Sequence, residues 1–403
     1  MSDRRMPTVL LAVGHGCVDI FQGIVPVMVP FLVAERHYDY VAVSGFVLAA
    51  TVLSSVVQPV FGLLTDRWVM RWLVPAAMVC TGLGVALVGA AGSYPLALAA
   101  IALSGIGVAA YHPEGARLAR VVTGGDHVRM SWFSLGGNVG FAFAPVIATP
   151  VLVLGGLAAA PVLLAPALLG VLVTVPLLRR RAGGAAPAGG ATRAGTAGSA
   201  ATAGAAVGGR GGARRGADDW PAFGVLTGVI VLRSIAFVGL STFLALFVQQ
   251  RVAQDATAGG IALFVLYAGG AVGTWLGGRM AATWGRLPTM RVSYAASAVA
   301  LAGVAFVPGP ALLAFVGLAS LALYAPFSLH ITLGQDYLPS RIGTASGVTL
   351  GLAVSVGGAF APALGAIAQA SSIQVMLGCL IVLPVLCAAL ALRLREPSAP
   401  ARL

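Results

Sequence analysis

The stretch PLALAAIALSGIGVAAYHPEGARLA, from Pro95 to Ala119, decides the class of fold. No charged or imidazole side chain occurs between Pro95 and Tyr111, and an ionisable group follows only with His112. A bilayer core about 30 Å thick needs roughly 20 apolar residues in helical conformation. The stretch is long enough to meet that need. It therefore predicts a membrane-spanning helix with ionisable residues near one of its ends.

The whole chain shares this character. Of its 403 residues, 59% are hydrophobic and only 9% are charged, and the mean hydropathy is +0.95. Open sheet edges are not tolerated in lipid, and the long alternation of a barrel is missing from the sequence. The sequence predicts an all-α integral membrane protein with twelve transmembrane helices, at roughly 8–33, 41–64, 72–91, 95–119, 131–154, 157–178, 221–249, 259–281, 290–307, 310–333, 342–368 and 373–393.

The basic residues predict the orientation of these helices. The net charge is +12, and all 24 basic residues are arginine. With a cytoplasmic N-terminus, only Arg36 and Arg251 fall in outer loops and Arg233 falls inside a span, which is the positive-inside distribution. We expect a multi-pass protein of the cell membrane with both termini in the cytoplasm, and no nucleic-acid partner. The four cysteines lie in apolar segments without metal-ligand spacing, so we expect no metal and no cofactor.

A change in composition divides the chain. Residues 179–219 are rich in Arg, Gly and Ala and contain no large apolar side chain before Asp219. Such a segment has too little apolar surface to form a core. We predict a flexible cytoplasmic linker over 179–219, between a six-helix bundle at 1–178 and a second at 220–403.

The two predicted bundles resemble each other. GFAFAP in the fifth span ends at Pro145, and GGAFAP in the eleventh ends at Pro362, with Gly140 and Gly357 five residues earlier in each case. Pairs of glycines four apart, Gly136 with Gly140 and Gly347 with Gly351, permit close helix approach. Transporters are often built from such repeats, so we assign Gly140, Pro145, Gly357 and Pro362 to gating.

Several motifs resemble a known family. GLLTDRW, from Gly62 to Trp68, resembles the loop between the second and third helices of the major facilitator superfamily. GHGCVDIFQGIVPVMVPFL in the first span, YHPEGARLA in the fourth, LRSIAFVGLSTFLALFV in the seventh and LPSRIGTASGVTLGLAVSVGGAFAPALG in the eleventh resemble its fosmidomycin-resistance branch. The resemblance implies two six-helix bundles around a central cavity, alternating access, a monomer, and export of small drugs or metabolites driven by proton entry.

Ionisable residues inside spans are costly and indicate function. In the first span, His15 and Gln22 lie four residues before and three after Asp19, so the three share one helical face. An acid beside an imidazole can hold and pass a proton. We assign Asp19 and His15 to proton coupling and Gln22 to substrate binding. The alternative reading, in which Asp19 only binds a neighbouring helix, stays open.

The fourth span adds a second group. We assign His112 and Glu114 to proton coupling, and Tyr111 and Arg117 to substrate binding. Pro113 removes a backbone donor, so we expect a helix break that lines a cavity and takes part in gating. Glu114 and Arg117, three apart, should pair along the helix, and a proton on Glu114 would release Arg117 to an anionic substrate. A simple salt bridge at a helix end is the alternative.

Arg233, in the seventh span, should need an anionic partner because a guanidinium keeps its charge when buried. It would face Asp19 across the proposed repeat axis. We assign Arg233 and His330 of the tenth span to binding of an anionic substrate. The resemblance places the first, fourth, seventh and tenth helices around the central cavity. Asp66 and Arg67, at the cytoplasmic end of the second span, are assigned to gating; an ordinary pair of loop charges is the alternative.

These features favour a proton-coupled antiporter that exports an anionic compound, fosmidomycin-like by resemblance. Proton-coupled uptake of a sugar or an organic acid is the closest alternative, and a receptor without transport is a weaker one. No motif of a hydrolase, nucleotide-binding loop or metal enzyme occurs in the sequence, so we expect no enzymatic activity. The expected partners are protons, a small-molecule substrate and the lipid bilayer.

Overall fold

The computed structural model describes residues 5–68, 70, 72–124, 127–182 and 217–397, without the side chains of residues 5, 66, 127–128, 179–182, 350 and 352–354. All regular secondary structure in these ranges is helical, which confirms the predicted fold class. The predicted linker lies almost entirely outside the described residues.

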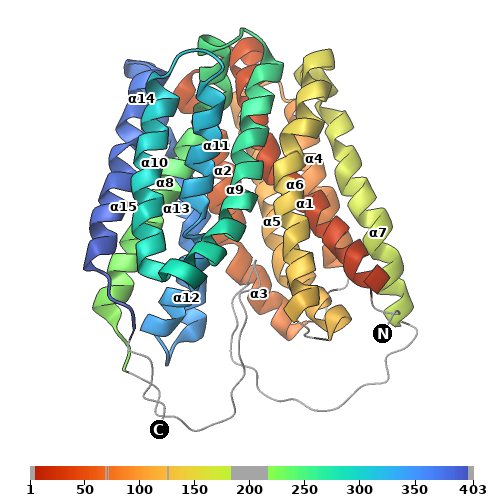
Figure 1. Ribbon diagram of the computed structural model, residues 1–403. Coiled ribbons are helices and arrows are strands. Elements are labelled where there is room, and N and C mark those ends of the chain that lie inside the picture. The colour runs from red at the N-terminus through yellow and green to blue at the C-terminus, as the bar shows by residue number, and fades with distance from the viewer. Residues whose placement is uncertain (1–4, 69, 71, 125–126, 183–216, 398–403) are drawn as a thin grey trace. The chain divides into compact units, whose positions relative to one another are not determined.

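The elements of the N-terminal half are α1 Arg5–Arg36, α2 Tyr40–Val56, α3 Gln58–Arg67, α4 Leu73–Val88, α5 Tyr94–Thr123, α6 His127–Gly155, the 3-10 helix η1 Leu157–Leu164 and α7 Ala165–Ala182. Those of the C-terminal half are α8 Trp220–Arg251, α9 Ala256–Trp284, α10 Arg286–Phe306, α11 Leu312–Tyr324, α12 Phe327–Tyr337, α13 Ile342–Ala370, α14 Ile373–Leu380 and α15 Val382–Arg393 (Figure 1).

All twelve predicted segments coincide with helices. Within the described residues, ten helical stretches are long and apolar enough to cross a membrane. The predicted third span is the shorter apolar helix α4, and the eleventh is α13, of 29 residues. Several spans consist of two helices. Pro59 is the second residue of α3, and Pro326 directly precedes α12. Proline has no backbone N–H to donate to the preceding turn, so the helix is interrupted at these positions.

The chain forms two compact units. Of the described residues, the first contains those at 5–25 and 52–182, and the second contains those at 26–51 and 217–397. The last part of α1 and most of α2 therefore belong to the second unit. In the first unit α4 packs along α5 and α7, and in the second α8 packs against α9, α13 and α15 (Figure 1). The division predicted at the linker stays a prediction.

Polar contacts hold residues 26–51 in the second unit. The backbone N–H of Tyr40 donates to Oε1 of Gln369 at 3.1 Å, and Nε2 of Gln250 donates to the Tyr40 hydroxyl at 3.1 Å. The backbones also come close. A Cβ atom on Gly365 would lie 2.6 Å from Oγ of Ser44, so glycine is required where α13 meets α2.

Glycines also allow close approach in the first unit. A Cβ atom on Gly140 of α6 would lie 2.5 Å from Cα of Gly16 in α1, and one on Gly136 would lie 2.8 Å from Cα of Ala12. This confirms the close approach predicted for the fifth span.

In the second unit the corresponding contact lies elsewhere than predicted. Among the described residues, no atom lies within 4 Å of a Cβ added to Gly347 or Gly351, so these residues show no close approach at this pair. The approach occurs further along α13, where the backbone N–H of Gly357 donates to Oγ of Ser234 at 3.0 Å. A serine hydroxyl on α8 fixes the contact, which the spacing of glycines does not reveal.

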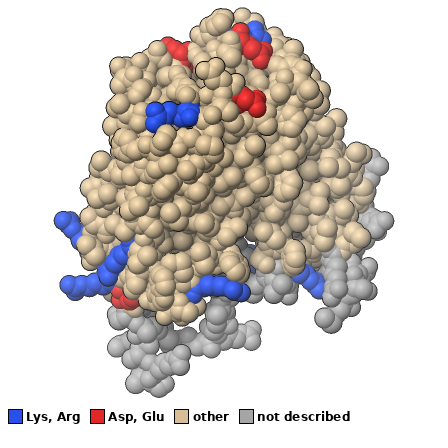
Figure 2. All heavy atoms as spheres, turned by 45° about the horizontal axis from the view of Figure 1, so that its top comes forward, with Lys and Arg blue, Asp and Glu red and all other residues tan. Residues whose placement is uncertain are grey.

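The surface fits a lipid environment. Figure 2 shows a face covered mostly by residues other than Lys, Arg, Asp and Glu. Large apolar side chains are exposed along the spans, among them Leu154, Leu172 and Val299. Apolar surface of this extent on helices long enough to cross a bilayer is expected to contact lipid.

Candidate functional site

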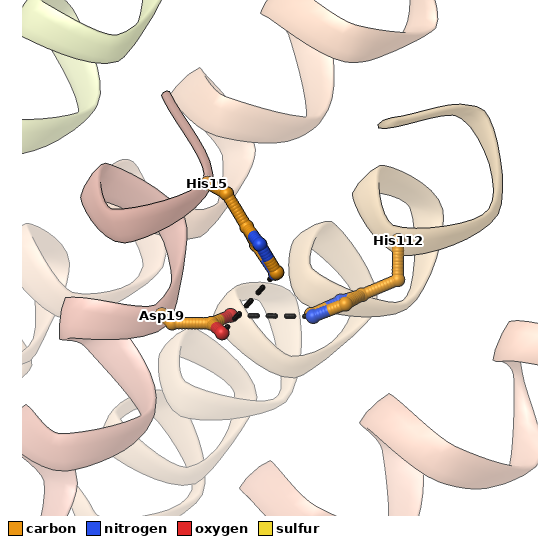
Figure 3. Close-up of side chains that lie close together, drawn as sticks. All are labelled: His15, Asp19 and His112. Carbon is orange, nitrogen blue, oxygen red and sulfur yellow. Dashed lines mark ion pairs between the residues drawn. The ribbon is translucent and has the colours of Figure 1, made fainter. Parts of the chain in front are cut away.

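Three ionisable side chains converge inside the first unit (Figure 3). His15 and Asp19 lie one turn apart on α1, and His112 reaches them from α5. Nε2 of His15 lies 3.3 Å from Oδ2 of Asp19, and Nε2 of His112 lies 3.2 Å from Oδ1 of the same carboxylate. A carboxylate is thus held between two imidazoles, and the side chains of Asp19 and His112 keep a small part of their surface exposed, 14% and 12%.

Backbone carbonyls fix the orientation of both imidazoles. Nδ1 of His15 lies 2.8 Å from the Phe133 carbonyl, and Nδ1 of His112 lies 2.8 Å from the Val108 carbonyl. A carbonyl only accepts, so each Nδ1 carries a hydrogen. The Nε2 atoms then face the carboxylate, and Nε2 of His15 is buried without a hydrogen-bond partner in the described structure. Because an unprotonated Nε2 and a carboxylate both only accept, a stable contact requires a proton between them.

Neighbouring residues complete this cluster. Nε2 of Gln22 donates to Oδ1 of Asp19 at 3.1 Å, and the Tyr111 ring stacks on His15 at 5.9 Å between centroids. Gln22 and Tyr111, predicted to bind substrate, therefore contact the predicted proton-coupling residues. Two neighbours of His15 were not predicted from the sequence. The Phe133 ring stacks on His15 at 4.3 Å, and a Cβ atom at Gly137 would lie 2.9 Å from Nε2 of His15. Both lie in an apolar run, which gives no signal of such contacts.

The predicted pair of Glu114 with Arg117 is confirmed. Nε of Arg117 donates to Oε2 of Glu114 at 2.7 Å, and Nη2 bonds to Oε1, so the pair is bidentate. Glu114 is buried, whereas Arg117 is partly exposed. A buried carboxylate is stabilised by such a partner, and its loss would leave a charge without compensation.

The predicted helix break at Pro113 is wrong. Helix α5 continues through Pro113 to Thr123. A proline removes one i to i−4 hydrogen bond and leaves the others in place. The turn that contains Pro113 is further held by Nδ1 of His112, which donates to the Val108 carbonyl.

In the second unit, Arg233 of α8 is buried, with 2% of its surface exposed. Nη1 donates to the Leu323 carbonyl at 3.4 Å, and the guanidinium carbon lies 5.2 Å from the centroid of Tyr324 and 5.3 Å from that of Phe327. Among the described residues no carboxylate forms an ion pair with Arg233, and its Nε has no hydrogen-bond partner. The Arg233 cation contacts two aromatic rings and a backbone carbonyl. The described residues do not supply the anionic partner that was predicted for it.

His330 of α12 lies in the same unit. Its Nε2 is 2.8 Å from the Tyr294 hydroxyl, and the two rings are stacked. Both residues are buried. Tyr294 was not identified from the sequence, although a tyrosine inside an apolar span is a usable signal because its hydroxyl needs a partner.

The residues assigned to gating lie on several helices. Arg67 is the last residue of α3 and is exposed, and the side chain of Asp66 lies outside the described residues. Pro145 and Pro362 lie inside α6 and α13. Gly140 and Gly357 are the contact points of these helices with α1 and α8. Their gating role stays a prediction.

His15, Asp19 and His112 also form the one described group whose possible ligand atoms lie within 4.8 Å of one another. Two imidazole nitrogens and a carboxylate are ligands that transition metals accept. A functional assay of this cluster therefore needs a control with a metal chelator.

Long apolar helices in two compact units, with buried charges inside the spans, define a polytopic membrane protein of the transporter class. A family model of the Major Facilitator Superfamily matches residues 11–362, and the chain belongs to this superfamily.

Two relatives cover most of the chain. The fosmidomycin resistance protein of Escherichia coli (strain K12) is 26% identical over 381 residues, which span 93% of this chain and 89% of that protein. An uncharacterized MFS-type transporter, YfnC, of Bacillus subtilis (strain 168) is 28% identical over 394 residues, which span 94% of this chain and 90% of that protein. The predicted resemblance to the superfamily is thereby confirmed.

Solved structures share the fold. A bacterial homologue of the human lysosomal transporter Spinster, in an inward-facing and occupied conformation, superposes with a TM-score of 0.76 and 16% identity over 100% of both chains. The nucleoside transporter NupG has a TM-score of 0.72 and 11% identity, covering 96% of this chain and 98% of its own. These structures confirm a major facilitator fold.

Proposed function

We propose that this transporter is a proton-coupled antiporter that exports a small anionic compound, of the phosphonate type that fosmidomycin represents. The observation that carries the proposal is the carboxylate of Asp19 between Nε2 of His15 and Nε2 of His112, at 3.3 and 3.2 Å. A relative described as a fosmidomycin resistance protein supports the substrate class.

The cluster can hold one proton or two. With each Nδ1 hydrogen bonded to a backbone carbonyl, an incoming proton binds at an Nε2 or at the carboxylate. One proton makes the three groups neutral in sum, and a second makes them cationic. Each change alters the attraction between α1 and α5, which carry these groups. Binding of a proton is thereby linked to the packing of two helices of one unit.

Glu114 and Arg117 provide a second place where a proton changes binding. A proton on Glu114 removes the negative charge that holds the Arg117 guanidinium in a bidentate pair. Arg117, which is partly exposed, can then bind an anion instead. Arg233 and His330 are the corresponding groups of the second unit. A guanidinium binds a carboxylate or a phosphonate through two parallel N–H donors.

The protein acts in the cell membrane, as a monomer, with both termini in the cytoplasm. The distribution of arginines supports this orientation because cytoplasmic loops carry the excess of positive charge. Protons entering the cytoplasm down their gradient drive the anion outward by alternating access.

The test is made with the full chain in liposomes that contain a pH-sensitive dye. A proton gradient is imposed, and fosmidomycin, a cationic drug panel and sugars are added in turn, with and without a chelator. Proton movement opposite to fosmidomycin, unchanged by the chelator, is expected. Proton movement together with a sugar or an organic acid would replace export with uptake. Flux of fosmidomycin without proton movement would remove the coupling from the proposal.

A further inference from the structure

Aromatic rings surround the buried cation of the second unit. Phe237 lies one turn after Arg233 on α8, and its ring meets that of Tyr324 edge to face at 4.8 Å. Tyr324 and Phe327 lie 5.9 Å apart, and Tyr267 of α9 lies 6.4 Å from Phe237. The four rings form a continuous group, the Arg233 ring cluster, with the guanidinium at one side of it.

Burial orders this cluster in depth. Arg233, Phe237 and Tyr267 are buried, whereas Tyr324 and Phe327 keep part of their surface exposed. The two partly exposed rings are the same two that lie over the guanidinium. A ligand that approaches Arg233 from the exposed side of these rings therefore contacts an aromatic surface before it contacts the cation.

The tenth span is broken at this place. Helix α11 ends at Tyr324 and α12 begins at Phe327, near the middle of the span Leu312–Tyr337. Pro326 cannot donate a backbone hydrogen bond to the preceding turn. The Leu323 carbonyl, at the end of α11, accepts a hydrogen bond from Nη1 of Arg233. Broken helices inside a membrane line binding sites, and the N-terminal end of the second piece carries a partial positive charge. The start of α12 thus adds to the positive potential around Arg233.

From this arrangement we propose that the second unit binds an organic anion that carries a flat aromatic ring beside its acidic group, such as an aryl phosphonate or an aryl carboxylate. The anionic group pairs with Arg233 at the start of α12, and the ring packs on Tyr324 and Phe327. The proposal rests on the anion-binding role of Arg233 in the proposed function and adds a preference for aryl compounds within its substrate class.

The chemistry explains why a ring increases the affinity. A small polar anion must displace the guanidinium from two rings and gains no apolar contact in return. When an aryl anion binds, the contact of the guanidinium with Tyr324 and Phe327 is replaced by a contact of the ligand ring with the same two rings. Such aromatic pairs add about 0.5–1.5 kcal/mol beyond the area that they bury. The expected preference for an aryl over an alkyl anion is therefore about 2- to 10-fold in affinity.

The test compares two phosphonates on the full chain in detergent by isothermal titration calorimetry. Phenylphosphonate is expected to bind about 2- to 10-fold more tightly than methylphosphonate. Phe327→Leu keeps an apolar side chain and removes the ring, so it should reduce this ratio to about one. Phe306→Leu, at an exposed ring on α10, is the matched control and should leave the ratio unchanged. Arg233→Gln should abolish binding of both phosphonates.

The outcomes separate this inference from the proposed function. Equal affinity for the two phosphonates in the native chain, or an unchanged ratio in Phe327→Leu, overturns the inference. Fosmidomycin export with proton counterflow in the liposome assay would then still support the proposed function. Loss of that export, with the aryl preference intact, would contradict the proposed function and leave the aryl-anion site in place.

Discussion

At the scale of single residues, the contact between Asp19 and two imidazoles makes a sharp prediction. Asp19→Asn keeps the size of the side chain and removes the charge that attracts a proton. We expect proton-linked flux to fall to the level of protein-free liposomes, while exchange of substrate across the membrane without a proton gradient continues. Asp255→Asn is the control, because Asp255 caps α9 through Thr257 and asparagine caps helices equally well.

Two measurements on the same liposomes check this prediction, namely the internal pH dye and counterflow of labelled substrate. Native pH dependence in a well-inserted Asp19→Asn variant would remove Asp19 from the coupling. Loss of both activities, with native insertion, would indicate a structural role for the carboxylate.

Residue contacts within one helix were predictable, and contacts between helices were not. The spacing of His15, Asp19 and Gln22 places them on one face of α1, and the pair of Glu114 with Arg117 follows from a separation of three. The approach of His112 to Asp19 depends on how α5 packs on α1. The residues next to His112 and Asp19 in the sequence carry no pattern that predicts this packing. The role of Phe133 depends partly on its backbone carbonyl, which has no residue-specific signal.

At the scale of elements, the contact between α1 and α6 rests on glycine. A Cβ atom at Gly140 would meet the backbone of Gly16, including its Cα at 2.5 Å. Backbone atoms cannot rotate out of the way as a side chain can, so a Cβ atom at Gly140 would force α1 and α6 apart. Gly140→Ala should lower the free energy of unfolding by about 1–3 kcal/mol. Gly347→Ala, where no atom of the described residues lies within 4 Å of an added Cβ, should be neutral or raise the free energy of unfolding by up to about 1 kcal/mol.

Thermal unfolding of both variants in the same detergent measures this difference. An equal midpoint for Gly140→Ala and Gly347→Ala would show that α1 and α6 can move apart at little cost. The result would then argue against close packing as a constraint on this pair.

Helix existence was also predictable at this scale, because hydropathy and span length mark all twelve segments. The breaks were not. Pro59 and Pro326 interrupt their spans, whereas Pro113, Pro145 and Pro362 lie inside continuous helices. A proline removes one hydrogen bond in every case, and the surrounding packing decides whether the helix continues.

The segment before α8 gives a prediction of pH dependence. Oγ and the backbone N–H of Ser340 donate to the Asp218 carboxylate, at 2.5 and 3.1 Å, and Nε of Arg341 lies 3.7 Å from it. These hydrogen bonds, with the nearby charge of Arg341, lower the pKa of Asp218 below its ordinary value. These contacts of the Asp218 carboxylate therefore stabilise the folded chain in full above the ordinary aspartate pKa of about 4. Their contribution is lost as the pH falls through the lower pKa that Asp218 has in the folded chain.

Melting temperatures of the native chain and of Ser340→Ala, measured from pH 7 downward, check this. The native chain should melt higher at pH 7, and the difference should shrink below about pH 4. Ser371→Ala removes a hydroxyl that donates to the Ile367 backbone carbonyl, which does not titrate, so this variant should show no such change with pH. A constant difference between the native chain and Ser340→Ala would assign the effect to packing of the serine.

At the scale of the whole molecule, the arginines define one end of the second unit. Arg286 at the start of α10 forms ion pairs with Asp336 of α12 and with Glu396 beyond α15. Arg291 donates through Nε to the Ala391 carbonyl at 3.0 Å. The ends of three spans therefore meet beside a group of basic residues. Positive charge of this kind stays on the cytoplasmic side during insertion.

If the arginine-rich end of the second unit is cytoplasmic, α9 crosses the membrane from the outer side to the cytoplasmic side. At about 1.5 Å per residue, its 29 residues are long enough to cross a hydrocarbon core of about 30 Å. Gln254 precedes α9 and Thr283 lies near its end, before Arg286, and both are exposed. Each is changed to cysteine in a chain with Cys379→Ala, because Cys379 is an exposed native thiol. Intact cells should react with a membrane-impermeant maleimide at Gln254→Cys, and at Thr283→Cys only after permeabilisation. Labelling in the reverse order would place the arginine-rich end outside and would contradict the orientation proposed for this chain.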